Sequence, residues 1–301
     1  MKVSVVIVTK NRENDLKQCL GSLVSQSAIL DELIIIDNNS SDSTKQVIKS
    51  FSNSVKFKIK YICEKKIGYP KIYNRGLVES SYNWVAFIDD DCVASIDWYK
   101  SIKSILKQNK SKAVVLGKSQ TYWVKNFYSQ LTLFIDRYWK EKSIKQDEVV
   151  DLEILDNKNI VYSKQFLRKN KLSFDESRIK FQNGASEDCD LGMQIQEKGG
   201  QSIYCSKIMV YHKDPKGPFH FYKKLFFSTV GHLSYEQKWK TYREKRLRES
   251  EINFRLFFND FCNEFKVNTI KRVGLIGHLF LSWIIIKITK IIYEKKYLFQ
   301  K

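Results

Sequence analysis

The chain of 301 residues is 43% hydrophobic and 14% aromatic, with only 12 Gly and 3 Pro. This composition excludes a disordered, collagen-like or low-complexity protein, and the length allows one or two domains with a sizeable core. A formal net charge of +19 favours a polyanionic partner, such as a phosphorylated substrate, an anionic membrane or a nucleic acid. A genome composition that favours Lys, Asn and Ile is the alternative explanation.

The first 120 residues alternate between two hydrophobic periods. Apolar, β-branched runs predict strands, and apolar residues at helical spacing predict helices between them. The predicted strands lie at 3–8, 32–36, 58–62 and 84–88, and the predicted helices lie around 16–23, 47–51, 72–80 and 102–106. Continuous apolar strands that alternate with helices predict an α/β fold with a parallel sheet covered on both faces.

The later part of the chain changes character twice. Residues 121–186 carry no clear period and are expected to mix strands, helix and loops. An acidic start predicts a helix at 187–198, and apolar runs predict strands at 202–205 and 208–210. Residues 216–301 carry 18 Lys or Arg against 7 Asp or Glu, more than half of the net charge. We therefore predict two regions, 1–215 and 216–301.

Carboxylates follow two of the predicted strands. Asp37 ends one apolar run, and Asp89, Asp90 and Asp91 directly follow another. Ligands of parallel sheets bind beyond the carboxyl ends of the strands, so these side chains are expected around one crevice. Mg²⁺ or Mn²⁺ prefers a few oxygen ligands and completes its shell with phosphate oxygens. The alternatives are a solvated acidic turn for the triplet and a simple turn-forming role for Asp37.

These carboxylates belong to a series of motifs that resembles the family two glycosyltransferases. The motifs occur in the family's order and span about the first two thirds of the chain. They read VVIVTKNR at 5–12, ELIIIDNNSSD at 32–42, a third motif that runs from GYP at 68–70 through NRGL at 74–77, FIDDD at 87–91, SEDCDL at 186–191, Gly199, and VYH at 210–212. The resemblance implies a GT-A nucleotide-diphospho-sugar transferase fold, with a Rossmann-like, mostly parallel sheet, to which this chain adds a basic C-terminal helical region.

Carried over residue by residue, the resemblance implies a donor site at the strand ends. The loop 9–12 would line the nucleotide pocket, Asp37 would bond the base, and Asp89 would contact the ribose. Asp91 would bind the Mn²⁺ or Mg²⁺ that bridges the diphosphate, and His212 matches a histidine that completes the metal site in some members. The candidate donor-binding residues are Thr9, Asn11, Arg12, Asp37, Asn74, Arg75, Asp89 and Asp90.

One position departs from the family's pattern. Many members have Arg directly before the Asn of the third motif, and here that residue is Tyr73. Arg75, directly after Asn74, is the candidate for the missing charge.

The resemblance implies that Asp188 is the catalytic base, with Glu187 as the second candidate. An acceptor hydroxyl has a pKa far above 7 and needs a base as it attacks the anomeric carbon. A base opposite the leaving group gives inversion. Acidic residues that only complement a helix dipole are the alternative.

We therefore expect a metal-dependent, inverting glycosyltransferase. It would move a sugar from a nucleotide-diphosphate donor to a lipid-linked or cell-surface glycan acceptor. A sugar nucleotidyltransferase is the rival within the fold class, but the first strand is not followed by a Gly-rich, basic phosphate loop. A non-catalytic membrane- or nucleic-acid-binding protein with a degenerate transferase domain is the other alternative.

The C-terminal region indicates contact with a membrane surface. Residues 273–286 form an uncharged stretch of 14 residues, bounded by Lys271, Arg272 and Lys287. This is shorter than the roughly 20 residues that span a bilayer, so insertion into the interface is expected. A buried helix is the alternative, and no recognisable motif supports nucleic-acid binding.

The cell compartment is predicted from the N-terminus and the cysteines. The apolar run 3–8 is shorter than the core of a signal peptide. The six cysteines form no C-x-x-C pair, as in a reducing compartment. We expect a cytoplasmic protein, peripheral on the inner face of the cell membrane.

Overall fold

The fold was analysed in a computed structural model, and the chain forms two compact units. Unit 1 comprises Met1–Tyr122, Ser143–Lys180 and Glu187–Lys213, and unit 2 comprises Trp123–Lys142, Phe181–Ser186 and Asp214–Lys301. The structure describes residues 1–66, 68–122, 126–132, 134–135, 152, 155–181, 186–213, 217–244, 254–266 and 269–298. The predicted boundary between 215 and 216 lies outside the described residues.

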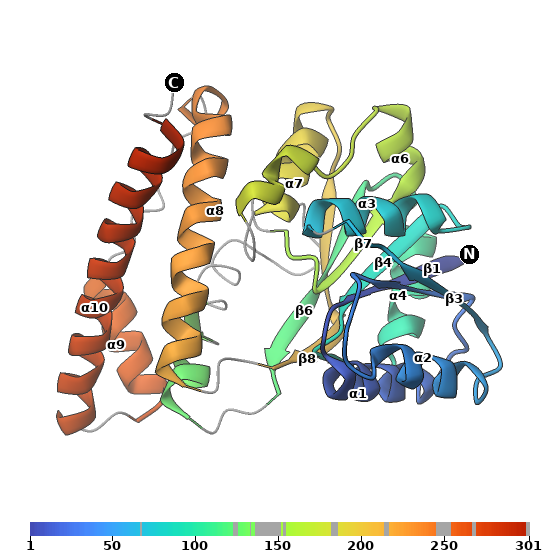
Figure 1. The fold of residues 1–301 in the computed structure, drawn as a ribbon, viewed down its shortest axis with the longest axis horizontal. Coiled ribbons are helices and arrows are strands. Elements are labelled where there is room, and N and C mark those ends of the chain that lie inside the picture. The colour runs from blue at the N-terminus through green and yellow to red at the C-terminus, as the bar shows by residue number, and fades with distance from the viewer. Residues whose placement is uncertain are drawn as a thin grey trace. The chain divides into compact units, whose positions relative to one another are not determined.

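Helices alternate with strands in unit 1, as the hydrophobic periods predict (Figure 1). The strands are β1 (Val3–Thr9), β2 (Glu32–Asp37), β3 (Lys58–Cys63), β4 (Trp84–Asp89), β5 (Cys92–Ala94), β6 (Val114–Thr121), β7 (Asn159–Ser163) and β8 (Ser202–His212). The helices are α1 (Glu13–Val24), α2 (Thr44–Ser52), α3 (Tyr69–Glu79), α4 (Trp98–Gln108), α6 (Lys164–Lys169), the short 3₁₀ helix Glu176–Phe181, and α7 (Glu187–Glu197).

The eight described strands form one mixed sheet. Their order is β3-β2-β1-β4-β7-β6-β8-β5. β1 pairs in parallel with β2 and β4, β2 with β3, and β6 with β8. β7 runs antiparallel to β4 and β6, and β5 runs antiparallel to β8. The predicted α/β fold with a mostly parallel sheet is confirmed.

Both faces of the sheet are covered, which explains the continuous apolar runs. Val5 and Ile7 of β1 belong to one core cluster, with residues of α1, α2 and α4. Val6 and Val8 point to the opposite face, with residues of α3, α6 and α7. All seven residues of β1 are buried, so the strand shows no polar alternation.

The second half of the sheet differs from the prediction. The runs 202–205 and 208–210 belong to one strand, β8, and the register of β6 against β8 shifts between Gly117 and Lys118. A Cβ at Gly117 would lie 2.3 Å from Nδ2 of Asn159, so only glycine fits there. That amide donates to the carbonyls of Lys118 and Ile208, both at 2.8 Å. The irregularity is therefore stabilised by a side chain distant in sequence.

Helices form the described part of unit 2. They are α8 (Pro218–Glu244), α9 (Phe254–Glu264) and α10 (Thr269–Tyr293), followed by a π-helical turn at Glu294–Leu298. Leu131, Phe221, Phe261 and Leu275 share one apolar cluster that joins residues before β7 to all three helices. Among the described residues, one stretch, Gly274–Lys296, has the length and apolar composition that a membrane-crossing helix requires.

Candidate active site

The carboxyl ends of β1 and β4 bring polar side chains together. The two strands are parallel neighbours, with Val8 paired to Asp89, so the residues that follow them meet at one edge of the sheet. Oγ1 of Thr9 donates a hydrogen bond to Oδ2 of Asp90 at 2.7 Å. The sequence-predicted residues of the first and fourth motifs are therefore in direct contact.

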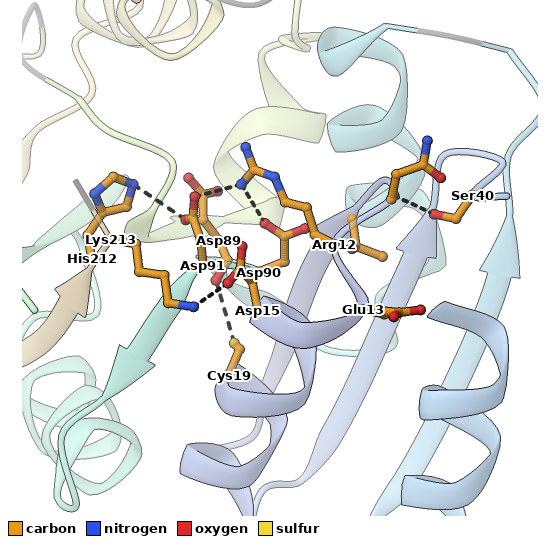
Figure 2. A network of polar contacts seen from close by, with 12 residues as sticks. Arg12, Glu13, Asp15, Cys19, Ser40, Asp89, Asp90, Asp91, His212 and Lys213 are labelled. Atoms are coloured by element: carbon orange, nitrogen blue, oxygen red, sulfur yellow. Dashed lines mark hydrogen bonds and ion pairs between the residues drawn. The ribbon is translucent and has the colours of Figure 1, made fainter. Parts of the chain in front are cut away.

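Arg12 joins two of the three consecutive carboxylates. Its Nη1 lies 3.0 Å from Oδ1 of Asp90 and 2.6 Å from Oδ2 of Asp91 (Figure 2). Although burial acts to lower the pKa of Arg12, the charges of Asp90 and Asp91 raise it above its ordinary value. The guanidinium therefore offsets part of the repulsion within the triplet.

Burial and mutual repulsion disfavour ionisation of Asp89 and Asp90. Burial raises the pKa of Asp90 to about 6, and Asp91 adds to the rise, while Arg12 opposes it. Burial raises the pKa of Asp89 well above its usual range, and the charges of Asp91 and Asp156 add to this effect. A cluster of this kind is stabilised by an added cation.

The pairing of β5 with β8 places His212 beside Asp91. β5 directly follows the triplet, and its first residue, Cys92, pairs with His212 at the end of β8. Nε2 of His212 consequently lies 3.4 Å from Oδ1 of Asp91. The next residue, Lys213, forms an ion pair with Asp15 of α1 (Figure 2).

Asp91 and His212 fit a hard or borderline divalent cation. A carboxylate oxygen and an imidazole nitrogen suit Mn²⁺, and the oxygen suits Mg²⁺. No group of three His, Cys, Asp or Glu side chains is arranged for a metal within the part of the chain that the structure describes. Asp91 and His212 would supply two ligands, and phosphate oxygens and water could add to the shell.

Two loops, which follow β1 and β2, are bonded to each other. Asn11, with φ of 51°, donates its N–H to Oγ of Ser40 at 2.9 Å, and its Oδ1 accepts from the N–H of Ser41 at 2.8 Å. Asp37 accepts from the N–H of Ser40 at 2.9 Å and from the hydroxyl of Tyr61 at 2.8 Å. Asp37 is 2% exposed, so its carboxylate is held firmly at the strand end.

Asn74 and Arg75 make their described contacts away from the triplet. Asn74 exchanges two hydrogen bonds of 2.9 Å with the backbone of Phe174. Arg75 forms an ion pair of 2.7 Å with Glu79, one turn along α3. Tyr73, the departure from the family's pattern, is buried and packs against Phe87 and Phe174.

The acidic start of α7 carries Glu187, Asp188 and Asp190. Oδ1 of Asp188 accepts from the N–H of Cys189 at 2.9 Å, and Oδ2 accepts from the N–H of Asn157 at 3.4 Å. Burial and the charge of Asp156 raise the pKa of Asp188. Asp190 is fully buried and accepts a hydrogen bond from the side chain of Gln194 at 3.0 Å, a contact within α7 that stabilises this helix. Glu187 is half-buried. Burial is the main cause of the raised pKa of Tyr69 and Tyr73, and the charge of Glu187 adds to the rise.

Sequence reasoning missed Asp156 and Lys158. They form an ion pair of 2.8 Å directly before β7, within reach of both Asp89 and Asp188. The available signal was a pair of charged residues at the start of a short apolar run, and no local pattern connects it to α7, about 30 residues later.

Known proteins resemble this chain over most of its length. It is 25% identical over 246 residues to chondroitin synthase of Escherichia coli, covering 71% of this chain and 35% of the relative. It is 30% identical over 233 residues to glycosyltransferase GlyA of Streptococcus pneumoniae, covering 72% of this chain and 31% of the relative. The chain thus spans about a third of the length of these curated relatives.

The fold has a full-length counterpart among solved structures. Mannosyltransferase PcManGT from Pyrobaculum calidifontis, solved with GDP-Man and Mn²⁺, aligns with a TM-score of 0.64 at 14% identity. The alignment covers 100% of this chain and 88% of that one, so the GT-A-like fold with C-terminal helices is shared. Residues 4–172 match the family described as "Glycosyl transferase family 2". Since this match covers more than half of the 301 residues, the chain belongs to glycosyl transferase family 2.

Proposed function

We propose that this protein transfers a sugar from a nucleotide-diphosphate donor to a glycan acceptor, with inversion at the anomeric carbon. The observation that carries the proposal is the joining of Thr9, Arg12, Asp90, Asp91 and His212 at one edge of the sheet. Three separate strands supply these residues, and α7 brings Asp188 into the same unit. Membership of glycosyl transferase family 2 supports the same chemistry.

The donor's nucleoside is proposed to lie over the ends of β1, β2 and β4. Asp37 is the candidate partner of the base, and Asp89 is the candidate partner of the ribose. The loop 9–12 is tied to the loop after β2 by the bonds of Asn11 to Ser40 and Ser41. Asn74 and Arg75 stay candidates for the diphosphate, although their present bonds to Phe174 and Glu79 would have to be exchanged.

The proposed metal ligands are Asp91 and His212. A divalent cation bound there supplies positive charge where negative charge develops on the leaving diphosphate. The chain's own contribution is to keep the two ligands together through the pairing of β5 with β8. PcManGT, a relative in fold, was solved with GDP-Man and Mn²⁺, which supports this choice of metal.

Asp188 is the proposed general base, with Glu187 as the second candidate. The acceptor oxygen forms a bond to the anomeric carbon while the bond from that carbon to the phosphate oxygen breaks. The electron pair of that bond leaves with the nucleoside diphosphate, and the acceptor proton passes to Asp188. Burial and the charge of Asp156 raise the pKa of Asp188, which makes it a stronger base than an exposed carboxylate.

An anionic membrane surface is the proposed location, with a lipid-linked or cell-surface glycan as the acceptor. Along α10, Leu275, Thr289 and Tyr293 are buried, while Phe280 and Trp283 are 61% and 55% exposed. Lys287 lies over the Trp283 ring, with Nζ 5.6 Å from its centroid, and more lysines follow. Exposed aromatic residues beside lysines are typical of a helix in the membrane interface.

A donor screen tests the proposal. The full chain is incubated with Mn²⁺ and a panel of UDP-, GDP- and dTDP-sugars, with undecaprenyl-diphosphate saccharides in anionic vesicles as acceptors. Release of a nucleoside diphosphate together with a lengthened saccharide is the expected result. Release of pyrophosphate would instead indicate a nucleotidyltransferase, and the absence of any product with every donor would favour a binding protein.

A further inference from the structure

A charged pair lies between the donor triplet and the acidic start of α7. Nζ of Lys158 is 2.8 Å from Oδ2 of Asp156, and the two side chains are 9% and 21% exposed. The backbone N–H of Lys158 donates to Oδ1 of Asp156 at 3.3 Å, and that of Asn159 donates to the carbonyl of Asp156 at 3.2 Å. The turn is therefore tied by backbone bonds in addition to the lysine.

This turn is bonded directly to Asp188. The N–H of Asn157 donates to Oδ2 of Asp188 at 3.4 Å, and Oδ1 of Asn157 accepts from the hydroxyl of Tyr162 at 2.9 Å. The other oxygen of Asp188 accepts from Cys189 at 2.9 Å. Asp188 is thus oriented by the turn on one side and by its own helix on the other.

The charges of the pair act on the surrounding carboxyls with opposite signs. After burial, the charge of Asp156 raises the pKa of both Asp188 and Asp89, whereas the charge of Lys158 lowers the pKa of Asp89. Among the described residues, the charge of Asp188 also acts on Tyr162 of β7, Tyr73 of α3 and Cys189 of α7, and Glu187 is its neighbour on α7. Lys158 is the cation closest to Asp156 in the described contacts, so it balances the carboxylate that acts most strongly on Asp188.

We propose that Asp156 and Lys158 form a positioning pair that fixes the orientation of Asp188 and sets how readily this carboxyl ionises. The inference rests on the proposed function in so far as Asp188 is the base. Removing Asp156 removes a negative charge beside Asp188 and eases its ionisation. Removing the ammonium of Lys158 removes a positive charge beside Asp156 and makes ionisation of Asp188 harder. The two substitutions therefore act in opposite directions, which a merely structural role does not predict.

The pair is tested without any substrate. The free energy of unfolding is measured against pH for the wild-type chain and for each variant of the pair. Each of these proteins is measured both with Asp188 and with Asp188→Asn. Because Asn does not ionise, the difference between the two curves reports the ionisation of Asp188 and its effect on neighbouring groups. For a raised pKa, this difference falls as the pH rises above the pKa of the unfolded state, and it levels off above the pKa of the folded state. Asp156→Asn should lower that pH by about one unit, and Lys158→Met should raise it by about one unit. Lys158→Arg keeps the charge and should restore the wild-type value.

The Lys60–Glu79 pair supplies the matched control, because it joins β3 to α3 away from Asp188. Lys60→Met and Glu79→Gln should leave the levelling-off pH unchanged. Shifts of the same sign in the two test variants, or no shift in either, would overturn the proposal. If Asp156→Asn does not fold, the Lys158→Met and Lys158→Arg variants decide by themselves. Full turnover by the Asp188→Asn variant would show that Asp188 is not the base. The unfolding measurement would still test whether Asp156 and Lys158 act on Asp188.

Discussion

Asp91 and His212 are 121 residues apart in the chain, yet Oδ1 of the first lies 3.4 Å from Nε2 of the second. The contact follows from the antiparallel pairing of Cys92 with His212, which ends β8 beside the residue preceding β5. A carboxylate and an imidazole that face each other across a strand pair have the arrangement of two metal ligands.

Asp91→Asn should abolish the Mn²⁺-dependent part of nucleotide binding. The amide has no negative charge, so we expect affinity for UDP or GDP in the presence of Mn²⁺ to fall by at least about tenfold. Calorimetric titration with and without Mn²⁺ measures the effect. Asp97→Asn, at an exposed carboxylate that pairs with Lys100, is the control and should bind normally. Unchanged affinity in a folded Asp91→Asn variant would exclude the metal role.

Asp188→Asn should separate binding from chemistry. Donor binding should stay nearly intact, whereas turnover should fall by ~10²–10⁴, the usual contribution of a general base. Single-turnover rates with the donor selected in the screen provide the measurement. Glu187→Gln is the matched control, since it neutralises the neighbouring carboxylate. If Glu187→Gln is the variant that loses turnover, the base is Glu187.

Stability towards acid should depend on Asp31. Burial acts to raise the pKa of Asp31, but hydrogen bonds from Tyr99, the Val3 N–H and Lys103 outweigh it and hold the pKa below 3.8. A carboxyl whose pKa is lower in the folded state than in the unfolded state stabilises the fold at pH values above its unfolded-state pKa. This stabilisation is lost as the pH falls through its folded-state pKa.

Asp31→Asn should therefore reduce the free energy of unfolding at pH 7 by about 1–2 kcal/mol and flatten its dependence on pH below about 4. Urea unfolding at a series of pH values gives both quantities. Asp97→Asn should change neither by a comparable amount. An unaltered pH dependence in Asp31→Asn would show that the Tyr99 and Lys103 contacts contribute little.

Two helix glycines should respond oppositely to the same substitution. A Cβ at Gly76 of α3 would lie 2.7 Å from Cγ1 of Val6 and 3.2 Å from Cε1 of Phe87, whereas one at Gly21 of α1 would meet nothing within 4 Å. Gly76→Ala should destabilise by about 1–3 kcal/mol through overpacking. Gly21→Ala should stabilise by roughly 0.5–1 kcal/mol, because alanine favours the helix. Thermal and urea unfolding test the pair, and equal shifts would contradict it.

Vesicle binding should depend on the exposed aromatic residues of α10. Replacing Phe280 and Trp283 together by Ser should weaken sedimentation with anionic vesicles without disturbing the fold, because both side chains are mainly exposed. High salt alone should release only part of the wild-type protein, since apolar insertion is not screened. Phe219→Ser, at an aromatic residue 73% exposed on α8, is the matched control. A loss of binding confined to Phe219→Ser would move the membrane contact to α8.

The sequence predicts the parts of the sheet that are buried on both faces. β1, β2 and β4 read as mainly apolar runs because nearly all of their residues are buried. β6 was not predicted, and β7 was not located within the mixed region 121–186. β7 lies between β4 and β6, antiparallel to both and far from both in sequence. No local pattern encodes that insertion.

The candidate site divides in the same way. Thr9, Asp90 and Asp91 are named by motifs and are brought together by the register of two neighbouring strands. The contacts of Arg75 with Glu79 and of Asp156 with Lys158 depend instead on rotamers and on a turn, which motifs do not specify.

The ion pairs of Arg12 with Asp90 and Asp91 place a positive charge beside these carboxylates in the absence of any ligand. A divalent cation at the proposed site would meet carboxylates whose negative charge is partly cancelled by Arg12, so it would compete with the guanidinium for them. A nucleotide diphosphate brings fresh negative charge for the displaced guanidinium, and arginine matches phosphate oxygens well. Metal and donor are thus expected to bind with positive cooperativity, because movement of Arg12 from the carboxylates to the diphosphate would favour both ligands.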